Sequence, residues 1–392
     1  MPTNYGSYET YKLIFHDVME DGLTFNSQSA VVTVYASTSD PTGTVAKAGY
    51  SVVTDCYHLV SISAFDGTTT YYTYDGSSYT AVQSGTAYDA EVSYYVKDDC
   101  TFEVVIADTN LLMDDNGNAI DVSASSIITV SFTATLNEAA VIGNPGNHNT
   151  MHIEYSNNPN WDGTGTEPTG ETPEDTVVVF TYELTANKVK SDGSALSGAG
   201  FTLYKLDVNS VEYVAVTFYE AVTLTDSSAY DSGVSAGTTY YTYDSDDKVY
   251  IASSSYEDGE TYYVVCTEMT GVTSFTWSGL DDGKYKLVET TTPTGYNTMD
   301  DLYFTVEATH TEDGITSLVI KDADGTTISG LGMEFSTTYS DGSISTNITN
   351  YTGSELPSTG GIGTTIFYAV GATLMVIAFV LLITKRRMRK YE

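Results

Sequence analysis

Three side chains that could react with one another are predicted to point into the core of one β-domain. Lys188, Glu289 and Asn350 each continue the buried face of a segment in which alternate residues are apolar. A buried amine, acid and amide are costly unless they contact one another. The neighbouring residues on these faces are Val178, Phe180, Tyr182, Leu184 and Ala186 for Lys188, Tyr285 and Leu287 for Glu289, and Ile344 and Ile348 for Asn350.

The chemistry open to such a trio is the exchange of one amide for another. An apolar site lowers the pKa of a lysine, so the neutral amine of Lys188 could attack the amide carbon of Asn350. A protonated Glu289 would polarise the amide and pass on the proton, and ammonia would leave. The other interpretation is a buried Lys188–Glu289 ion pair, with Asn350 as a strand-end residue.

A second reactive motif lies near the C-terminus and is followed by two segments of contrasting character. The pentapeptide is Leu356, Pro357, Ser358, Thr359 and Gly360. Residues 361–384 then contain no charge and are long enough to cross a bilayer as one transmembrane helix. Residues 385–392 form a basic tail, which predicts a cytoplasmic C-terminus and an exterior location for everything before the helix.

These three parts in this order resemble the LPxTG sorting signal of Gram-positive surface proteins. The resemblance implies that sortase cleaves between Thr359 and Gly360 and joins Thr359 to an amine of peptidoglycan or of another subunit. Pro357 bends the peptide, and Gly360 leaves room for the sortase thiolate. The chain would be exported, held in the membrane only until cleavage, and then attached to the cell wall. A tail-anchored membrane protein with a Pro/Gly linker is the alternative.

The composition fits an exterior β-protein. The net charge is −37, which argues against nucleic acid and anionic membrane surfaces as partners. Tyrosine accounts for 33 of the 392 residues, and glycine for another 33, which is typical of strands and tight turns. Because no secretory signal opens the chain, we expect export information and further sequence to lie upstream of Met1.

Residues 1–171 are predicted to form one β-sandwich, with strands near 11–15, 30–35, 101–107, 127–136 and 151–155. Segments 8–25, 131–150 and 151–160 resemble the middle domain of sortase-assembled backbone pilins, an immunoglobulin-like sandwich. The resemblance implies a Lys–Asn isopeptide bond beside an acidic residue. Asp17 and Asn157 end apolar faces and are the candidate acid and amide, whereas Lys12 faces away. The resemblance places the lysine that forms the bond upstream of the matching region. In the alternative interpretation, Asp17 and Asn157 are both turn residues.

Residues 172–351 are predicted to form a second domain, after a polar linker at 160–175. Segments 185–205, 275–297 and 344–361 resemble a Cna B-type (SpaA-type) domain, another immunoglobulin-like sandwich. The resemblance implies an isopeptide bond between Lys188 and Asn350 with Glu289 as the catalytic acid, the same trio that alternation selects. Such a bond forms once, without turnover. The middle, near 208–270, is an insertion.

A tyrosine-rich motif occurs twice, at 67–96 and 237–265, and each copy predicts a β-hairpin insertion. The first lies near 57–99. Its tyrosines could bind a ligand or form one face of an enlarged sheet. Cys56 and Cys100 bracket the first copy, so a disulfide between them could close it, and the oxidising environment outside the cell permits such a bond. The cysteine spacing predicts no metal site, and His148 and His152 are expected on the surface.

The sequence therefore predicts an all-β chain of two tandem sandwich domains followed by one transmembrane helix. The expected function is structural: a covalently polymerised pilus backbone subunit, not an enzyme, without a cofactor. The alternative is a monomeric wall-anchored adhesin whose tyrosine-rich insertions bind a host or environmental ligand. No Pro-Lys dipeptide occurs in the chain, so the pilin-motif lysine used in polymerisation is expected upstream of Met1.

Overall fold

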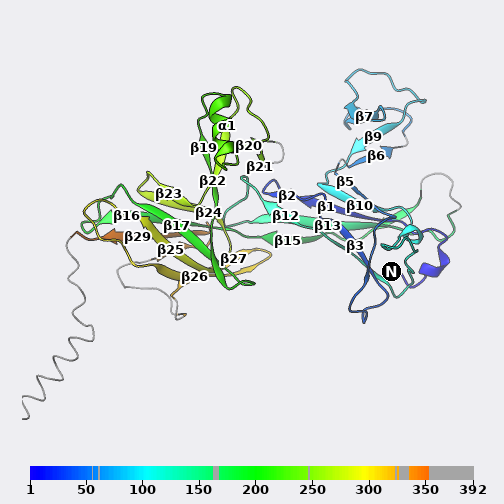
Figure 1. Cartoon of the computed structure of the whole chain (residues 1–392). Helices are drawn as coiled ribbons and strands as arrows, with labels where there is room; N and C mark the ends of the chain where they lie inside the picture. The colour runs from blue at the N-terminus through cyan, green and yellow to red at the C-terminus, as the bar shows by residue number, and fades with distance from the viewer. Residues whose placement is uncertain are drawn as a thin grey trace, which may run out of the picture.

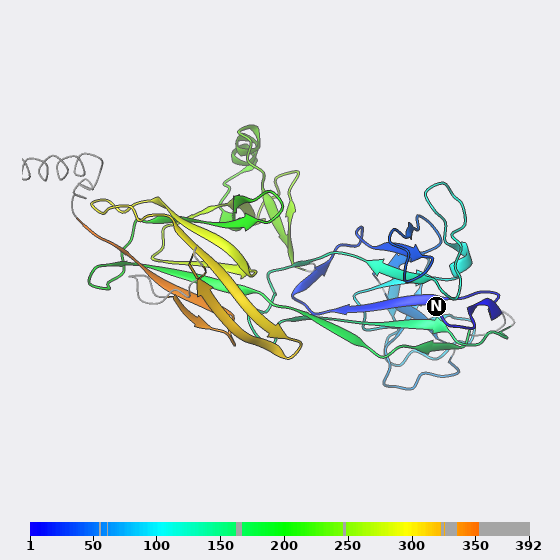
Figure 2. The same cartoon turned by 90° about the horizontal axis from the view of Figure 1, so that it is seen from below.

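The computed structural model describes residues 1–54, 56–60, 62–161, 167–245, 248–322, 325 and 335–352. The fold is mostly β and multi-domain. Figures 1 and 2 show two β-units that lie end to end, and Figure 1 shows a smaller sheet that projects from each unit on the same side. Within the described residues no helix combines the length and apolar character needed to cross a bilayer. The segment predicted to do so, 361–384, lies outside the described residues.

The first unit is organised around a central strand, β1 (Leu13–Met19), which pairs with antiparallel strands on both sides. Its neighbours are β13 (Asn147–Ser156) and β10 (Phe102–Ile106). The sheet order is β14-β13-β1-β10-β5, with β15 also on β13. The other strands of this sheet are β14 (Thr169–Glu171), β5 (Ser51–Val53) and β15 (Asp175–Val179).

Two smaller sheets complete the first unit. One has the order β11-β3-β4 and the other pairs β12 with β2. Apolar side chains of β1, β3 and β10 form one buried cluster, because alternate residues of each strand face the same side. The bounds are β2 (Leu23–Phe25), β3 (Val31–Tyr35), β4 (Thr44–Val45), β11 (Ile127–Ser131) and β12 (Ala134–Leu136), with short 3-10 turns η1 (Tyr5–Ser7) and η2 (Thr109–Leu111).

The second unit consists of two sheets that share one core. The first has the order β24-β16-β29-β28, and the second has the order β18-β17-β25-β26-β27 with β23 on β17. Strand β16 (Tyr182–Lys190) alternates strictly between buried and half-buried residues over its first seven positions. The remaining strands are β17 (Gly200–Asp207), β18 (Glu212–Ala215), β23 (Glu268–Thr270), β24 (Ser274–Leu280), β25 (Gly283–Thr291), β26 (Leu302–Thr311), β27 (Gly314–Lys321), β28 (Phe335–Thr338) and β29 (Ser343–Asn350).

The two projecting sheets share one strand plan and form the tyrosine sheets. The first tyrosine sheet has the order β6-β9-β7-β8, and the second has the order β19-β22-β20-β21. In each, two tyrosines stack face to face: Tyr57 on Tyr79 at 3.9 Å and Tyr219 on Tyr250 at 3.8 Å. The bounds are β6 (Tyr57–Val60), β7 (Tyr71–Tyr74), β8 (Tyr79–Ala81), β9 (Tyr94–Lys97), β19 (Phe218–Val222), α1 (Ser227–Ser235), β20 (Tyr241–Asp244), β21 (Val249–Ala252) and β22 (Tyr262–Cys266).

The repeat seen in the sequence is thus a repeated small fold. In both sheets the tyrosine of the motif's first strand lies opposite a tyrosine of the last strand: Tyr72 pairs with Tyr95, and Tyr241 with Tyr263. The opposite face of the second sheet is covered by α1, whose Tyr230 packs on buried Tyr262 at 5.5 Å between ring centroids. Each copy is larger than the hairpin expected from sequence, because two further strands complete it.

The units meet through the backbone around Gly143 and Asn144. The Gly143 amide donates to Thr181 O at 3.0 Å, and Asn144 Oδ1 accepts from the Ile315 amide at 2.7 Å. Gly143 has φ +74°, and a Cβ there would lie 2.3 Å from the Asp341 carbonyl carbon, so this approach requires glycine.

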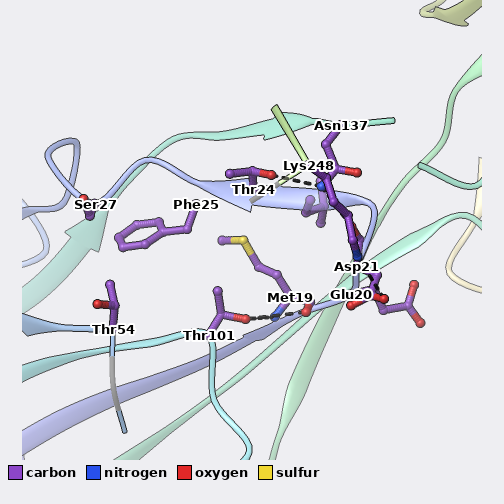
Figure 3. A pocket seen from close by; sticks show the side chains of 11 residues that line it. Met19, Glu20, Asp21, Thr24, Phe25, Ser27, Thr54, Thr101, Asn137 and Lys248 are labelled. Carbon is purple, nitrogen blue, oxygen red and sulfur yellow. Dashed lines mark hydrogen bonds and ion pairs between the residues drawn. The ribbon is translucent and has the colours of Figure 1, made fainter. Parts of the chain in front are cut away.

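The second tyrosine sheet adds another contact with the first unit. Lys248 Nζ lies 3.0 Å from Asp21 Oδ2. Figure 3 shows Lys248 beside Asp21 and Asn137 at the edge of a pocket of about 460 Å³. Tyr250 of β21 also faces the first unit, where burial and the nearby Glu138 carboxylate raise the pKa of Tyr250 to about 12.

Candidate functional site

The structure brings Lys188, Glu289 and Asn350 together near the C-terminal ends of β16, β25 and β29. Lys188 belongs to β16 and Asn350 to β29, two parallel neighbours in one sheet, whereas Glu289 comes from β25 in the other sheet. Strict alternation along each strand turns all three side chains inward. The site therefore joins the first and last strands of the unit, which are neighbours in one sheet, and Glu289 reaches it across the core from the other sheet.

The three side chains form a closed set of polar contacts. Lys188 Nζ lies 2.6 Å from Asn350 Oδ1 and 2.9 Å from Glu289 Oε1. Asn350 Nδ2 donates to both oxygens of Glu289, at 2.8 and 3.1 Å. The Met299 backbone amide donates to Glu289 Oε2 at 2.8 Å, which anchors the carboxyl group from outside the trio.

Lys188, Glu289 and Asn350 are buried from solvent. The side chains of Lys188 and Glu289 are 0% exposed. The ammonium group also lies 5.1 Å from the centre of the Phe201 ring. Burial lowers the pKa of Lys188, although contact with Glu289 opposes this effect. A lower pKa increases the fraction of Lys188 that is present as the neutral, nucleophilic amine.

This arrangement can carry out one amide exchange with balanced atoms. The Nζ–Cγ bond forms between Lys188 and Asn350, the Cγ–Nδ2 bond breaks, and one ammonia leaves. Glu289 touches both the nitrogen that loses protons and the nitrogen that gains one, so a single carboxyl group could transfer the proton between them. All three residues were predicted from sequence, but the role of the Met299 amide was not.

In the first unit, the two predicted residues do not meet. Asp17 lies opposite Met151 in the β1–β13 register, whereas Leu13, at the other end of β1, lies opposite Tyr155. Asn157 lies two residues after Tyr155, is exposed, and donates to Thr169 O at 2.9 Å. The pairing of Asp17 with Asn157 is therefore wrong, because the antiparallel register puts them at opposite ends of β1.

The amide beside Asp17 belongs to Asn149. Asn149 Nδ2 donates to Asp17 Oδ2 at 3.1 Å, and Asp17 is only 3% exposed. Burial raises the pKa of Asp17 to about 6. Lys12 forms an ion pair with Glu154 at 2.8 Å on the other face, as alternation predicted.

Cys56 and Cys100 form the predicted disulfide, at the base of the first tyrosine sheet. Cys266 of β22 is unpaired and lies 3.3 Å from Glu220 Oε2. The sorting-motif residues Leu356, Pro357, Ser358, Thr359 and Gly360, together with the predicted basic tail, lie outside the described residues.

Strand β15 differs from the predicted domain division. Residues 172–179 were assigned to the second domain, but Asp175–Val179 pairs with β13 of the first unit from Met151 to Asn147. The chain leaves the first sheet only at Phe180, immediately before β16 begins. The linker expected at 160–175 therefore includes β14, which also belongs to the first sheet.

Family comparisons match the two regions that carry the predicted chemistry. Residues 182–324 match the SpaA family, described as a prealbumin-like fold domain. Residues 348–390 match the LPXTG cell wall anchor motif. This chain is a cell-wall-anchored surface protein of the Gram-positive LPXTG type. Its SpaA region includes β16 and β25, and thus Lys188 and Glu289, while Asn350 follows in the anchor match.

A curated relative is similar to a larger share of the chain. This chain is 28% identical over 271 residues to the trypsin-resistant surface T6 protein of Streptococcus pyogenes serotype M6. The match covers 66% of this chain and 48% of the relative, so the chain spans about half the length of the relative it matches.

Several solved pilin structures are similar at lower sequence identity. The pilus 2b backbone protein of group B streptococcus is 20% identical, with 91% of each chain covered and a TM-score of 0.38. Domains D2 and D3 of the major pilin SpaD from Corynebacterium diphtheriae are 15% identical, with 90% of each chain covered and a TM-score of 0.38. At TM-scores this low, the likeness does not establish a common fold.

Proposed function

We propose that this chain is a structural, non-catalytic backbone subunit of a sortase-assembled pilus, and that a Lys188–Asn350 isopeptide bond closes its second domain. The observation that carries the proposal is the buried contact of Lys188 with Asn350 and Glu289 between the first and last strands. Tension on a wall-anchored protein enters β16 from the first unit and leaves through β29 toward the sorting motif. A bond between these strands would carry it covalently.

The proposed assembly uses the C-terminal segments in turn. The apolar stretch 361–384 holds the exported chain in the membrane as a helix, with the basic tail in the cytoplasm. Sortase then cleaves between Thr359 and Gly360 and transfers Thr359 to an amine. That amine belongs to a neighbouring pilin subunit during polymerisation and to peptidoglycan at the end. Both units act as immunoglobulin-like segments of the shaft.

A monomeric adhesin is the second candidate, and the tyrosine sheets favour it. Each carries a face of half-buried or exposed tyrosines, and the stacked pairs repeat closely between the two copies. Such faces provide rigid aromatic contact area at little entropic cost. In this case the chain would be attached singly to peptidoglycan and would bind a host or environmental ligand.

Polymerisation predicts a ladder on immunoblots of cell-wall extracts from the source organism. Antibodies against this chain should detect bands that resist boiling in SDS and are spaced by one subunit. Thr359→Ala should remove the ladder, because the carbonyl group for transfer would no longer be presented in the LPxTG motif. Ser358→Ala is the matched control, since the third position of that motif is variable, and it should keep the ladder.

A single wild-type band at the monomer mass would contradict the pilus and leave the adhesin. Loss of the ladder in Ser358→Ala as well would mean that the variants fail at export or folding. Total cellular chain should therefore be measured in parallel, and equal amounts in both variants are expected.

A further inference from the structure

Four side chains that could bind a metal converge where the first tyrosine sheet joins the first unit. His16 lies on β1, His58 on β6, Glu103 on β10, and Asp98 directly follows β9. One ligand atom from each lies within 4.8 Å of those of the other three. His16 Nδ1 and His58 Nε2 approach the same oxygen, Glu103 Oε1, at 2.9 and 2.8 Å. His58 Nε2 lies 3.6 Å from Asp98 Oδ2.

These short distances are not well-formed hydrogen bonds. His16 Nδ1, His58 Nε2 and Glu103 Oε1 are all buried, and none has a hydrogen-bond partner of acceptable geometry. His16 is 4% exposed and Glu103 is 3% exposed, so bulk water does not reach them. Buried polar atoms are nearly always satisfied in folded proteins. Three unsatisfied atoms aimed at one another indicate a missing shared partner.

We propose that His16, His58, Glu103 and Asp98 bind a divalent transition-metal ion, with zinc as the best fit. Two imidazole nitrogens and two carboxylate oxygens match the ligands and the number that zinc takes in four-coordinate sites. Calcium and magnesium prefer all-oxygen shells of six or more ligands, which this set does not offer. Tetrahedral ligands about 2.0–2.1 Å from zinc lie roughly 3.3 Å apart, so the side chains would open by a few tenths of an ångström.

The surroundings would orient the ligands. The second nitrogen of His16 faces Glu154 Oε2 at 3.7 Å, and Glu154 is held by Lys12. The His16 ring stacks on His152 with 4.5 Å between centroids, so it cannot swing freely. A carboxylate behind a ligating imidazole is the usual outer-shell support of zinc sites.

The covalent frame near the site also restrains it. Asp98 N donates to Cys56 O at 2.7 Å, and the disulfide links Cys56 to Cys100, three residues before Glu103. A bound ion would tie two ligands of the tyrosine-sheet base to two ligands of the central sheet. It would therefore fix the first tyrosine sheet against the body of the first unit.

The alternative is a cluster of charges without an ion. Burial alone would lower the pKa of His16, but contact with Glu103 and Glu154 outweighs it and raises that pKa to about 9. Two protonated imidazoles sharing one carboxylate would then replace the metal site. The two arrangements differ in zinc affinity, which can be measured directly.

The test is zinc binding to the full chain in detergent, by equilibrium dialysis with metal analysis and with millimolar calcium present. Calcium occupies the many surface carboxylates, so zinc held against it reports a site with nitrogen ligands. We expect one tightly bound zinc per chain. His58→Gln should weaken binding by about 100-fold or more. This side chain is half-exposed, so the variant should fold.

The matched control is His148→Gln, because His148 also contacts a carboxylate, Glu20 Oε2 at 3.0 Å, but lies outside the cluster. It should bind zinc like the wild type. Asp98→Asn gives a second variant at an exposed ligand, and cobalt should give the intense visible absorption of tetrahedral coordination only when the site is intact. Equal zinc affinity in wild type and His58→Gln, or equal loss in His148→Gln, would overturn the proposal.

Discussion

Wild-type protein should be lighter than its sequence by one ammonia, about 17 Da, for the second-domain bond, and Glu289→Ala should not show this loss. The carboxyl group of Glu289 touches both reacting nitrogens, so its removal leaves Lys188 and Asn350 without proton transfer. Intact-mass spectrometry of the full chain, with each variant compared with its own sequence mass, gives the answer directly.

The same substitution should lower stability strongly. A bond across the 162 residues that separate Lys188 and Asn350 removes loop-closure entropy worth about 5 kcal/mol, by the logic used for disulfides. Unpairing a buried charge adds about 3–5 kcal/mol. The first 5 kcal/mol alone corresponds to a fall in Tm of about 10–20 °C for a domain of this size. Calorimetry would resolve such a change.

A matched control separates the reaction from general loss of charge. Glu307 is an exposed acid of β26 that pairs with Lys321 at the surface. Glu307→Ala should keep the mass loss and nearly all of the stability, because exposed ion pairs contribute little. If wild type, Glu289→Ala and Glu307→Ala all have full sequence mass, Lys188, Glu289 and Asn350 form only an ion-paired core.

Removing the disulfide should loosen the first tyrosine sheet without unfolding the unit that carries it. Cys56 and Cys100 are 44 residues apart, and closing such a loop is worth about 4 kcal/mol in the chain-entropy model. That corresponds to two to three orders of magnitude in local opening. In the Cys56→Ser/Cys100→Ser variant, hydrogen exchange measured by mass spectrometry should accelerate in β6–β9 and stay slow in β1 and β10.

Cys266→Ser is the control, because this unpaired cysteine ends β22, the equivalent of β9. It should leave exchange unchanged in both tyrosine sheets. A chelator should be present throughout, so that a metal at His16 and His58 cannot replace the covalent restraint. Unchanged exchange in β6–β9 of the double variant would show that packing alone holds the sheet.

The outcome at the two predicted sites shows what alternation can and cannot determine. Alternation identifies the face of each strand, and this was enough for Lys188, Glu289 and Asn350, whose segments also carry family motifs. Alternation does not determine the pairing register between strands that are far apart in sequence. Asn157 was chosen on face alone, and the register places it beyond the end of β1 that is remote from Asp17.

The His16 cluster was missed for a related reason. Its four side chains are far apart in sequence, except for Asp98 and Glu103. The pairing of β1 with β10 brings His16 and Glu103 together, and the pairing of β6 with β9 brings His58 and Asp98 together, so the spacing of these residues along the chain does not predict the cluster. Similarly, β15 was assigned to the second domain because it follows the polar linker predicted at 160–175, but its backbone groups pair with β13. The repeat, in contrast, was visible because its tyrosines recur in order.

The position of Lys188 near the end of β16 has a consequence for length. With the bond formed, the second unit can extend under load only through the short part of β16 before Lys188, since the 162-residue loop lies outside the loaded path. Unfolding that loop would otherwise release roughly 500 Å of chain, at about 3.3 Å per residue. In a fibre of such subunits, each second unit would therefore keep a nearly constant length under load.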